Sequence, residues 1–443
     1  MKILTTIGPV SENTNEIKKI SKFTNLFRLN TSHNNLDWHK NVSKKIKKVN
    51  KNNKLLIDIP GIKPRTANKK EIKIIKNKKI CFYFGKKPKN NFLKIPLTKP
   101  LPKINKKEKY FSVSDGTFAF RIVKSSKDFI IGLSLQNFNL KTMKGLNIPN
   151  SIYDNFKQSK LCLDFIKKIK KVNFDLVGLS FVQDEKIIKK VKKKYPKLLI
   201  VSKIENLEGV KNIDKIVYYS DIIMIDRGDL SAEIGTVNLF SSIKKISHYC
   251  KKYGKPLIMA TENLESMMTK NLPTKSEILS ISFYQNIGVD VIMLSDETAI
   301  SIKFINIIKW LYAFLNNKKK IMKTNKVDLW NLISNKNNIP LVFFTKSGKS
   351  IYEFFKKEDT SYKYVFTESK KIVSLTKFKT NVEVFKISKF NNKNLQRFIY
   401  SNLKKFKNII FKNSNLIMLI YVSFPRKNSF ANTIQILKRE DIN

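Results

Sequence analysis

The first two thirds of the chain alternate between two kinds of segment. One kind is a short apolar run bounded by turn residues, typical of a buried strand. The other is lysine-rich with apolar residues at three- and four-residue spacing, typical of an amphipathic helix, as in 184–195 and 241–253. The apolar runs are KILTTIG (2–8), NLFRLN (25–30), LLIDI (55–59), DLVGLSFV (175–182), LLIVSKIE (198–205), DIIMID (221–226), PLIMAT (256–261) and DVIMLS (290–295).

Eight such runs, alternating with helices, predict an α/β fold built on a (β/α)8 or TIM barrel. The alternation breaks once, between Thr66 and about Thr142, where the β-like runs KKICFYF, YFSVSDGTFAF and DFIIGLSL follow one another without helices. We therefore expect a small β-barrel domain at 67–142, inserted after the third strand as a lid. The catalytic barrel then comprises 1–66 and 143–322.

Further strand-like runs follow the barrel. A helical stretch reaches about Met322, a polar linker comes next, and the later runs are PLVFFT (340–345), YKYVFT (362–367) and NLIMLIYVS (415–423). This pattern predicts a separate C-terminal α/β domain at 323–443.

Composition adds one question, which is why the chain is so basic. Lys and Arg number 87 against 34 Asp and Glu, a formal charge of +53, which on its face suggests nucleic acid or an anionic membrane surface. The lysines are spread along the whole chain beside Asn, Ile and Phe, whose codons are AT-rich, so mutational bias explains them. No RRM, KH or zinc-finger spacing accompanies them. We expect no nucleic-acid partner.

The chain also lacks signals for export or membrane insertion. The N-terminus reaches polar residues too soon for a signal peptide, and the best apolar run, 416–424, is too short to span a bilayer. Cys81, Cys162 and Cys250 are far apart, without the spacing of a zinc site or a disulfide frame. We expect a cytoplasmic protein with reduced thiols and no membrane partner.

Polar residues stand at the carboxyl ends of the predicted strands, where the loops of such a barrel carry its chemistry. A ring of ion pairs that plugs the barrel mouth is the structural alternative to a functional site. The residues are Arg28, Asn30, Ser32, Asp58, Lys203, Glu205, Asp229, Thr261 and Ser295.

Several of these residues suit a metal and a phosphate. Glu205 and Asp229, on adjacent strands, can supply oxygens to a hard divalent cation and leave positions for a substrate. Lys203 precedes Glu205 by two residues, so both side chains point to the same side of a strand. Arg28 adds a fork-shaped phosphate donor. The residues alone thus indicate metal-assisted chemistry on an anionic, phosphorylated oxyacid.

The same motifs resemble those of the pyruvate kinase family, in order and in approximate spacing. The combination of SKIEN with RGDL is highly specific. The matching segments are TTIGP (5–9), RLNTSH (28–33), LIDIPGIKPRT (56–66), VSDG (113–116), KGLNIP (144–149), SKIENLEG (202–209), DRGDL (226–230), AT-x-x-LESM (260–267) and MLSDETA (293–299).

The resemblance implies transfer of the phosphoryl group of phosphoenolpyruvate to ADP, giving pyruvate and ATP, as in the last step of glycolysis. Glu205 and Asp229 resemble the ligands of Mg2+ or Mn2+. Lys203 resembles the lysine that stabilises the phosphoryl group in flight and the developing enolate. The resemblance also implies a homotetramer.

Other positions carry over in the same way. Arg28 would hold the phosphate, while the backbone of Gly228 and the hydroxyl of Thr261 would hold the substrate carboxylate. Thr261 with Ser295 would help relay a proton to the enolate. The nucleotide would contact Asn30, Thr31, Ser32, His33, Arg65 and Lys144.

In the C-terminal domain, TKSGKS (345–350) follows an apolar run and precedes a helical one, so it could cradle a phosphate. In allosteric members of the family this loop holds a phosphate of an activator. The matching loop SFPRKNSFANT (423–433) has no glycine, so effector binding stays open. The candidate residues are Thr345, Ser347, Gly348, Lys349 and Ser350.

The loop after the third strand departs from the family most informatively. Potassium-dependent members read D-T-K-G-P-E-I-R-T, and their monovalent cation site would correspond to Asn30, Ser32 and Asp58. Here Lys63 replaces the glutamate. We expect its ammonium group to stand in for the ion, paired with Asp58, so that potassium is not required.

Other departures include a shortened insert, a C-terminal domain without most of its first helices, and four changed residues. Asp226 replaces a small residue, Gln183 an arginine, Glu262 a glutamine and Asp296 a glycine. Two rival functions remain. A magnesium-dependent barrel aldolase or lyase acting on phosphoenolpyruvate or pyruvate would not need the insert or the ADP-side residues, and a nucleic-acid-binding protein rests on charge alone.

Overall fold

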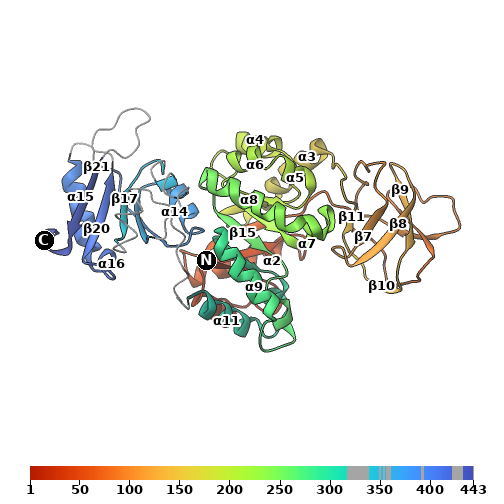
Figure 1. Ribbon diagram of the computed structural model, residues 1–443, viewed down its shortest axis with the longest axis horizontal. Helices are drawn as coiled ribbons and strands as arrows, with labels where there is room; N and C mark the ends of the chain where they lie inside the picture. Colours follow the sequence, from red (N-terminus) through yellow and green to blue (C-terminus); the bar gives the residue numbers. More distant parts are fainter. Residues whose placement is uncertain are drawn as a thin grey trace. The chain divides into compact units, whose positions relative to one another are not determined.

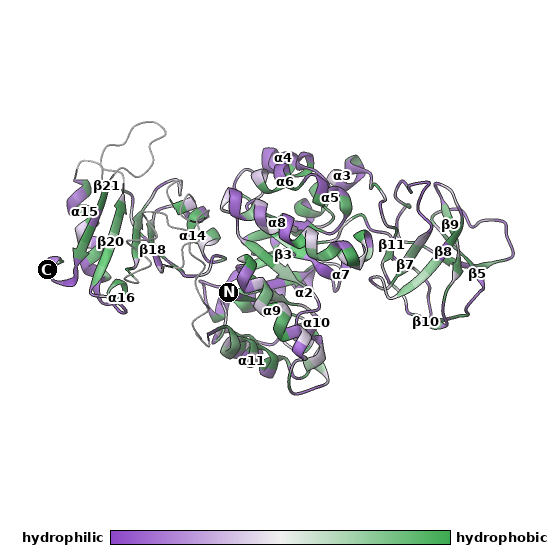
Figure 2. Ribbon diagram, in the orientation of Figure 1, coloured by the Kyte–Doolittle hydropathy of each residue, from purple (hydrophilic) through white to green (hydrophobic). Residues whose placement is uncertain are grey.

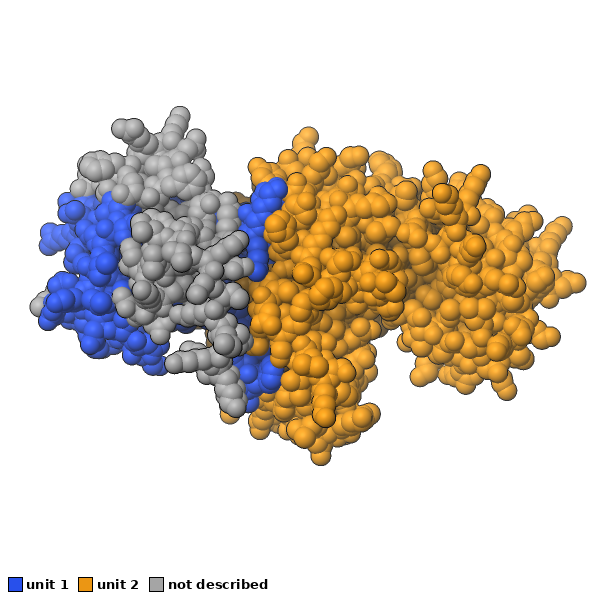
Figure 3. Space-filling view, in the orientation of Figure 1, with its two compact units in different colours: residues 1–2, 250–256, 313–443 blue, residues 3–249, 257–312 orange. Residues whose placement is uncertain are grey.

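The computed structural model describes residues 1–316, 339–348, 351–352, 355, 361–390, 394–421 and 433–442. Contacts divide the chain into two compact units, drawn in Figure 3. The larger unit contains residues 3–249 and 257–312, and the smaller contains residues 1–2, 250–256 and 313–443.

The larger unit contains a closed barrel of eight parallel strands, as predicted (Figure 1). The order around the barrel is β1-β16-β15-β14-β13-β12-β3-β2. The strands are β1 (Lys2–Thr6), β2 (Leu26–Asn30), β3 (Lys54–Ile59), β12 (Leu176–Leu179), β13 (Leu199–Ile204), β14 (Ile222–Asp226), β15 (Leu257–Ala260) and β16 (Val291–Leu294).

Helices follow the strands around the outside of the barrel. In α4, Ile187, Ile188 and Val191 are buried, while its many lysines make it largely hydrophilic in Figure 2. The helices are α1 (Thr14–Ser21), α2 (Leu36–Val49), α3 (Asn155–Lys168), α4 (Glu185–Lys194), α5 (Leu207–Lys211), α6 (Ile213–Tyr219), α7 (Arg227–Ile234), α8 (Leu239–Tyr253), α9 (Lys275–Ile287), α10 (Asp296–Ala299) and α11 (Phe304–Asn316), with short 3-10 turns η1 (Ile169–Lys171), η2 (Thr236–Asn238) and η3 (Glu265–Met268).

Local sequence fixes where several of these helices begin and end. The hydroxyl of Thr274 accepts a hydrogen bond from the Glu277 amide, and the Glu277 carboxylate accepts one from the Thr274 amide, forming a capping box at the start of α9. Gly288 ends the same helix with φ +81°, a conformation that suits glycine. At the start of α4, the side chain of Asp184 accepts a hydrogen bond from the Lys186 amide and caps the helix.

The insert is a β-domain, as predicted, but its strands form two sheets where the sequence suggested a small barrel. A six-stranded sheet has the order β11-β7-β8-β9-β5-β6, and β10 pairs with β4. Phe82, Phe111 and Phe120 pack its core. The strands are β4 (Ile72–Ile74), β5 (Lys79–Tyr83), β6 (Leu93–Pro96), β7 (Tyr110–Val113), β8 (Phe118–Ser125), β9 (Phe129–Ser134), β10 (Phe138–Leu140) and β11 (Leu146–Asn147).

The smaller unit contains a five-stranded sheet of order β19-β18-β17-β20-β21, in which only β21 is antiparallel to its neighbour among the described strands. Strands β18 and β20 are drawn as mostly hydrophobic in Figure 2. The elements are β17 (Leu341–Phe344), β18 (Lys363–Thr367), β19 (Val382–Lys386), β20 (Leu416–Tyr421), β21 (Thr433–Lys438), α14 (Lys370–Thr376), α15 (Leu395–Lys405), α16 (Lys407–Ile410) and η4 (Arg439–Asp441). Across the described parts of the chain, the helices are too short or too polar to cross a membrane.

Candidate active site

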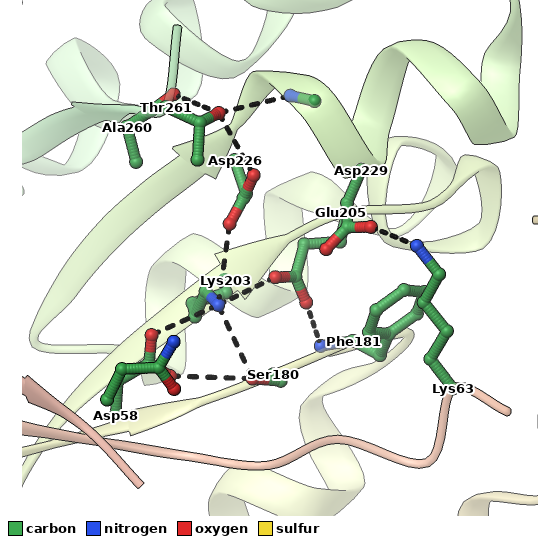
Figure 4. Close-up of polar contacts among 12 residues, drawn as sticks. Asp58, Lys63, Ser180, Phe181, Lys203, Glu205, Asp226, Asp229, Ala260 and Thr261 are labelled. Atoms are coloured by element: carbon green, nitrogen blue, oxygen red, sulfur yellow. Dashed lines mark hydrogen bonds and ion pairs between the residues drawn. The ribbon is translucent and has the colours of Figure 1, made fainter. Parts of the chain in front are cut away.

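Lys203 lies at the centre of a buried network at the carboxyl end of the barrel strands (Figure 4). Its Nζ is 2.8 Å from Glu205 Oε1, 3.2 Å from Asp58 Oδ2 and 3.5 Å from Asp226 Oδ2. Burial alone would lower the pKa of Lys203, but these carboxylates raise it above its ordinary value. The lysine is therefore a permanently charged centre with acids on several sides.

Arg28 and Asp58 form a second buried pair beside it. Arg28 donates to Asp58 Oδ2 through Nε at 3.0 Å and Nη2 at 2.7 Å, and its Nη1 donates to Thr6 Oγ1. Burial alone would raise the pKa of Asp58, yet Lys203 and Arg28 together hold it below its usual value. Asp58 is thus an ionised acid that fixes both cations.

Three acids at this mouth could hold a metal ion. Glu205, Asp226 and Asp229 each present a carboxylate oxygen, and these oxygens lie within 4.8 Å of one another. Burial raises the pKa of Glu205 to about 8 although Lys203 opposes the shift, and burial also raises the pKa of Asp226. Oxygen-only donors of this kind suit magnesium or manganese.

The predicted pairing of Lys63 with Asp58 is wrong. The ammonium group of Lys63 contacts Asp229 Oδ1 and lies 3.4 Å from Asp115 Oδ1 in the insert. The carboxylate of Asp58 is already paired with Arg28 and Lys203. Opposed by burial, Asp229 and Asp115 raise the pKa of Lys63. The lysine therefore approaches a candidate metal ligand instead of the expected potassium position.

Gly145 makes room for this course of the Lys63 side chain. A Cβ atom at position 145 would lie 2.7 Å from Lys63 Cε and 2.8 Å from its Nζ. A larger residue at this position would push the end of the Lys63 side chain aside.

Thr261 lies at the end of β15 in a strained conformation. The φ angles of Thr261 and Glu262 are +63° and +52°. For Thr261, whose side chain is β-branched, this backbone conformation costs about 1–3 kcal/mol. The hydroxyl of Thr261 accepts from the Gly228 amide at 3.1 Å and lies 3.1 Å from Asp226 Oδ1, to which it can donate. Arg227 donates to the Thr261 carbonyl and holds the turn in place.

Ser295 is less closely connected than expected. It follows β16, and its backbone amide donates to Glu297 Oε2 at 2.6 Å. Its buried hydroxyl has no hydrogen-bond partner within the described residues.

The expected nucleotide residues lie on the loops beside Asp58. Thr31 Oγ1 donates to the Asp58 carbonyl at 2.8 Å, and the Ser32 amide donates to Asn30 Oδ1. His33 is exposed, and its pKa is lowered by partial burial and by Arg65. Lys144 and Arg65 flank the exit of the insert, where Arg65 Nη1 donates to the Met143 carbonyl. The side chains of this group remain accessible to a ligand.

The candidate effector loop is only partly described. The amide of Gly348 donates to Thr345 Oγ1 at 2.9 Å, and Gly348 has φ +79°. Ser347 lies between them. Lys349, Ser350 and nearly all of the loop 423–433 lie outside the described residues.

Sequence reasoning missed three members of the site. Asp226 differs from the family pattern, and it ends a strand whose neighbours carry the predicted acids. Asp115 belongs to the VSDG segment, for which the resemblance implies no role. Glu233 lies four residues after Asp229 on α7, and that helical spacing puts both on one face, so the pattern could have revealed it.

Glu233 connects the barrel to the end of the insert. Its Oε1 accepts from Asn147 Nδ2 at 3.0 Å and from the Tyr153 hydroxyl at 3.3 Å. Burial raises its pKa to about 8, although Lys63 opposes the shift. The folded protein therefore favours the neutral acid.

Replacing Glu233 with glutamine should make stability less sensitive to alkali. The raised pKa stabilises the fold fully below the ordinary pKa of 4.5, and this contribution is lost as pH rises through about 8. Glutamine cannot ionise, so the variant should lose roughly 2 kcal/mol less between about pH 5 and pH 9. Urea unfolding at both pH values measures this. Glu440→Gln, an exposed change, is the control, and equal pH dependence in wild type and Glu233→Gln would contradict the assignment.

Comparison with known proteins places the chain in a family. The family model described as pyruvate kinase, barrel domain, matches residues 1–303. A pyruvate kinase of Encephalitozoon cuniculi is 30% identical over 70% of this chain and 73% of its own length, and one of Thermotoga maritima is 27% identical over 99% of both. The crystal structure of pyruvate kinase from Pyrobaculum aerophilum superposes with a TM-score of 0.78 at 18% identity, covering 99% of this chain and 98% of that one. Since the family model spans the whole barrel, the chain belongs to the pyruvate kinase family.

Proposed function

We propose that the protein transfers the phosphoryl group of phosphoenolpyruvate to ADP. An oxygen of the ADP β-phosphate bonds to phosphorus, the bond from phosphorus to the enol oxygen breaks, and the enolate takes a proton at its methylene carbon to give pyruvate. Charge neutralisation and positioning carry most of such a transfer. The observation that supports the proposal best is the Lys203 ammonium, held among Asp58, Glu205 and Asp226 in a barrel of this family.

Each residue has a proposed role. Lys203 stabilises the phosphoryl group in transfer and the enolate oxygen, and Arg28 binds the phosphate. Glu205 and Asp229 hold Mg2+ or Mn2+, which when bound neutralises the substrate oxygens. The Gly228 amide and Thr261 hydroxyl bind the substrate carboxylate after giving up their mutual hydrogen bond. Thr261 and Ser295 help move the proton.

The proposal also assigns residues to the nucleotide and to an effector phosphate. Asn30, Thr31, Ser32, His33, Arg65 and Lys144 face the nucleotide, and Thr345, Ser347 and Gly348 are candidates for an effector phosphate. The three cysteines are buried thiols, which fits a cytoplasmic protein.

Pyruvate formation tests the proposal directly. Purified protein with phosphoenolpyruvate, ADP and MgCl2 should form pyruvate and ATP in equal amounts, and chelation of the metal should stop the reaction. A barrel aldolase or lyase would form no ATP from phosphoenolpyruvate and ADP. Tight, salt-dependent nucleic-acid binding without turnover would instead favour the third function.

Potassium should not be required for activity. The expected potassium position includes Asp58, whose carboxylate is already paired with the buried cations Arg28 and Lys203, and a further monovalent cation beside them would be repelled. Replacing KCl with tetramethylammonium chloride at constant ionic strength should change kcat by less than about twofold. Lys63→Glu should create a potassium requirement, with Lys99→Glu in the adjacent loop as a control for charge reversal. A wild-type enzyme that stops without potassium would refute this idea.

We also propose self-association, with a tetramer as the expected state. Large apolar side chains are exposed close together on η2, α8 and α9: Val237 is 93% and Leu279 69% exposed, and the rings of Phe240 and Phe283 stack at 5.2 Å. An exposed apolar surface of this kind is typical of an interface. Light scattering should show an oligomer that Phe240→Glu weakens.

A further inference from the structure

Asp226 occupies a position in the site that the proposed function does not use. It ends β14, is 7% exposed, and presents its carboxylate to the same space as Glu205 and Asp229 (Figure 4). Its Oδ1 lies 3.1 Å from Thr261 Oγ1, and its Oδ2 lies 3.5 Å from Lys203 Nζ. Asp226 therefore has oxygens close enough to the other two acids to share one cation with them.

The two expected ligands are already partly neutralised. Glu205 Oε1 lies 2.8 Å from Lys203, and Asp229 contacts Lys63. Asp226 has only the more distant contact with Lys203 among the ion pairs of the described residues. Its charge is thus the least compensated of the three, and a cation approaching the site would be attracted to it most strongly.

A second observation points to a ligand in this space. Glu205 Oε1 is fully buried and has no hydrogen-bond partner of good geometry among the described residues, and its contact with Lys203 is an ion pair. A buried carboxylate oxygen in this state has unused capacity to coordinate a cation.

We infer that Asp226 is a third carboxylate ligand of the divalent cation, beside Glu205 and Asp229. This inference rests on the proposed function, which places a cation at those two acids. A third carboxylate raises the charge of the donor set and with it the affinity for the metal. It still leaves about half of an octahedral shell for substrate oxygens and water. The metal should then bind tightly before the substrate arrives.

Binding of Mn2+ alone tests the inference without any turnover. Mn2+ is titrated into the full-length protein, and free Mn2+ is read from its electron paramagnetic resonance signal. Asp226→Asn should raise the dissociation constant for Mn2+ by about tenfold or more. Glu205→Gln should raise it at least as much. Circular dichroism checks that each variant is folded. If the Asp226→Asn variant does not fold, Asp226→Ala is used in its place.

Glu233→Gln is the matched control. Glu233 is also buried, also has a raised pKa and lies on the same helix as Asp229, but it is outside the group of three acids. Its variant should bind Mn2+ within about twofold of wild type, because Glu233 contributes no ligand oxygen. The control thus separates coordination from the general effect of replacing a buried carboxyl group at the site.

Each outcome decides one question. Unchanged Mn2+ binding by both Asp226 variants overturns the inference, and so does an equal loss in Glu233→Gln, which would indicate a general effect of substitution at the site. Loss of binding in Glu205→Gln alone would leave the proposed function intact and remove only the role of Asp226. Failure of the proposed function appears separately, as wild-type protein that forms no pyruvate.

Discussion

Replacing Lys203 with methionine should reduce kcat for pyruvate formation by roughly a thousandfold. Methionine keeps the approximate length of the side chain but removes the only ammonium that the described structure places among Asp58, Glu205 and Asp226. Preorganised charge of this kind contributes about 2.7–4 kcal/mol to a transition state. A coupled assay for pyruvate at saturating phosphoenolpyruvate, ADP and MgCl2 measures the loss.

The matched control for this change is Lys192→Met. Lys192 also pairs with a buried acid, at 3.2 Å from Asp221, but Asp221 precedes strand β14, at the end of the barrel away from the site. This variant should keep kcat within about twofold of wild type. Lys203→Met protein that folds and retains a tenth or more of the wild-type kcat would show that Lys203 is a structural cation only.

Replacing Asp58 with alanine should destabilise the fold by about 3–5 kcal/mol. The change leaves Arg28 buried without its carboxylate and removes one of the acids around Lys203, and breaking one side of a buried ion pair has this cost. Urea unfolding followed by circular dichroism measures the free energy of unfolding.

A second ion pair allows a comparison at equal distance. Lys211 and Glu208 are 2.7 Å apart, as are Arg28 and Asp58, but their side chains are 57% and 26% exposed, against 7% and 2%. Glu208→Ala should therefore cost less than about 1 kcal/mol. Similar losses in both variants would mean that burial does not control the strength of the Asp58 pair.

Lowering the pH should remove the contribution of the Asp58 ion pairs to the stability of the fold. The pKa of Asp58 is lowered by Lys203 and Arg28 against the effect of burial, so its contribution to stability is present above its ordinary pKa of 3.8 and is lost as pH falls through the folded value. The Asp58→Ala variant should accordingly lose less stability than wild type between about pH 5 and pH 3.

The barrel could be predicted because each strand is a short apolar run that stops at a polar residue. The insert could be predicted because the apolar spacing typical of helices is absent between Thr66 and Thr142. Strands β19 and β21 were missed because they lie at the edges of their sheet, where exposed residues interrupt the apolar pattern.

The site could be predicted less completely than the barrel. Residues at strand ends converge wherever eight parallel strands close, so Lys203, Glu205 and Asp58 could be placed together. The partner of Lys63 could not, because the path of a long side chain out of a loop depends on distant contacts. Its ammonium passes Gly145 to reach Asp229, and neither residue is near it in the sequence.

That passage makes positions 63 and 145 a coupled pair in the evolution of this enzyme. A methyl group at 145 would overlap the end of the Lys63 side chain, so alanine there would move the ammonium group away from Asp229. A shorter residue at position 63 meets no obstacle from glycine. A substitution at either position can therefore change the cation chemistry of this site.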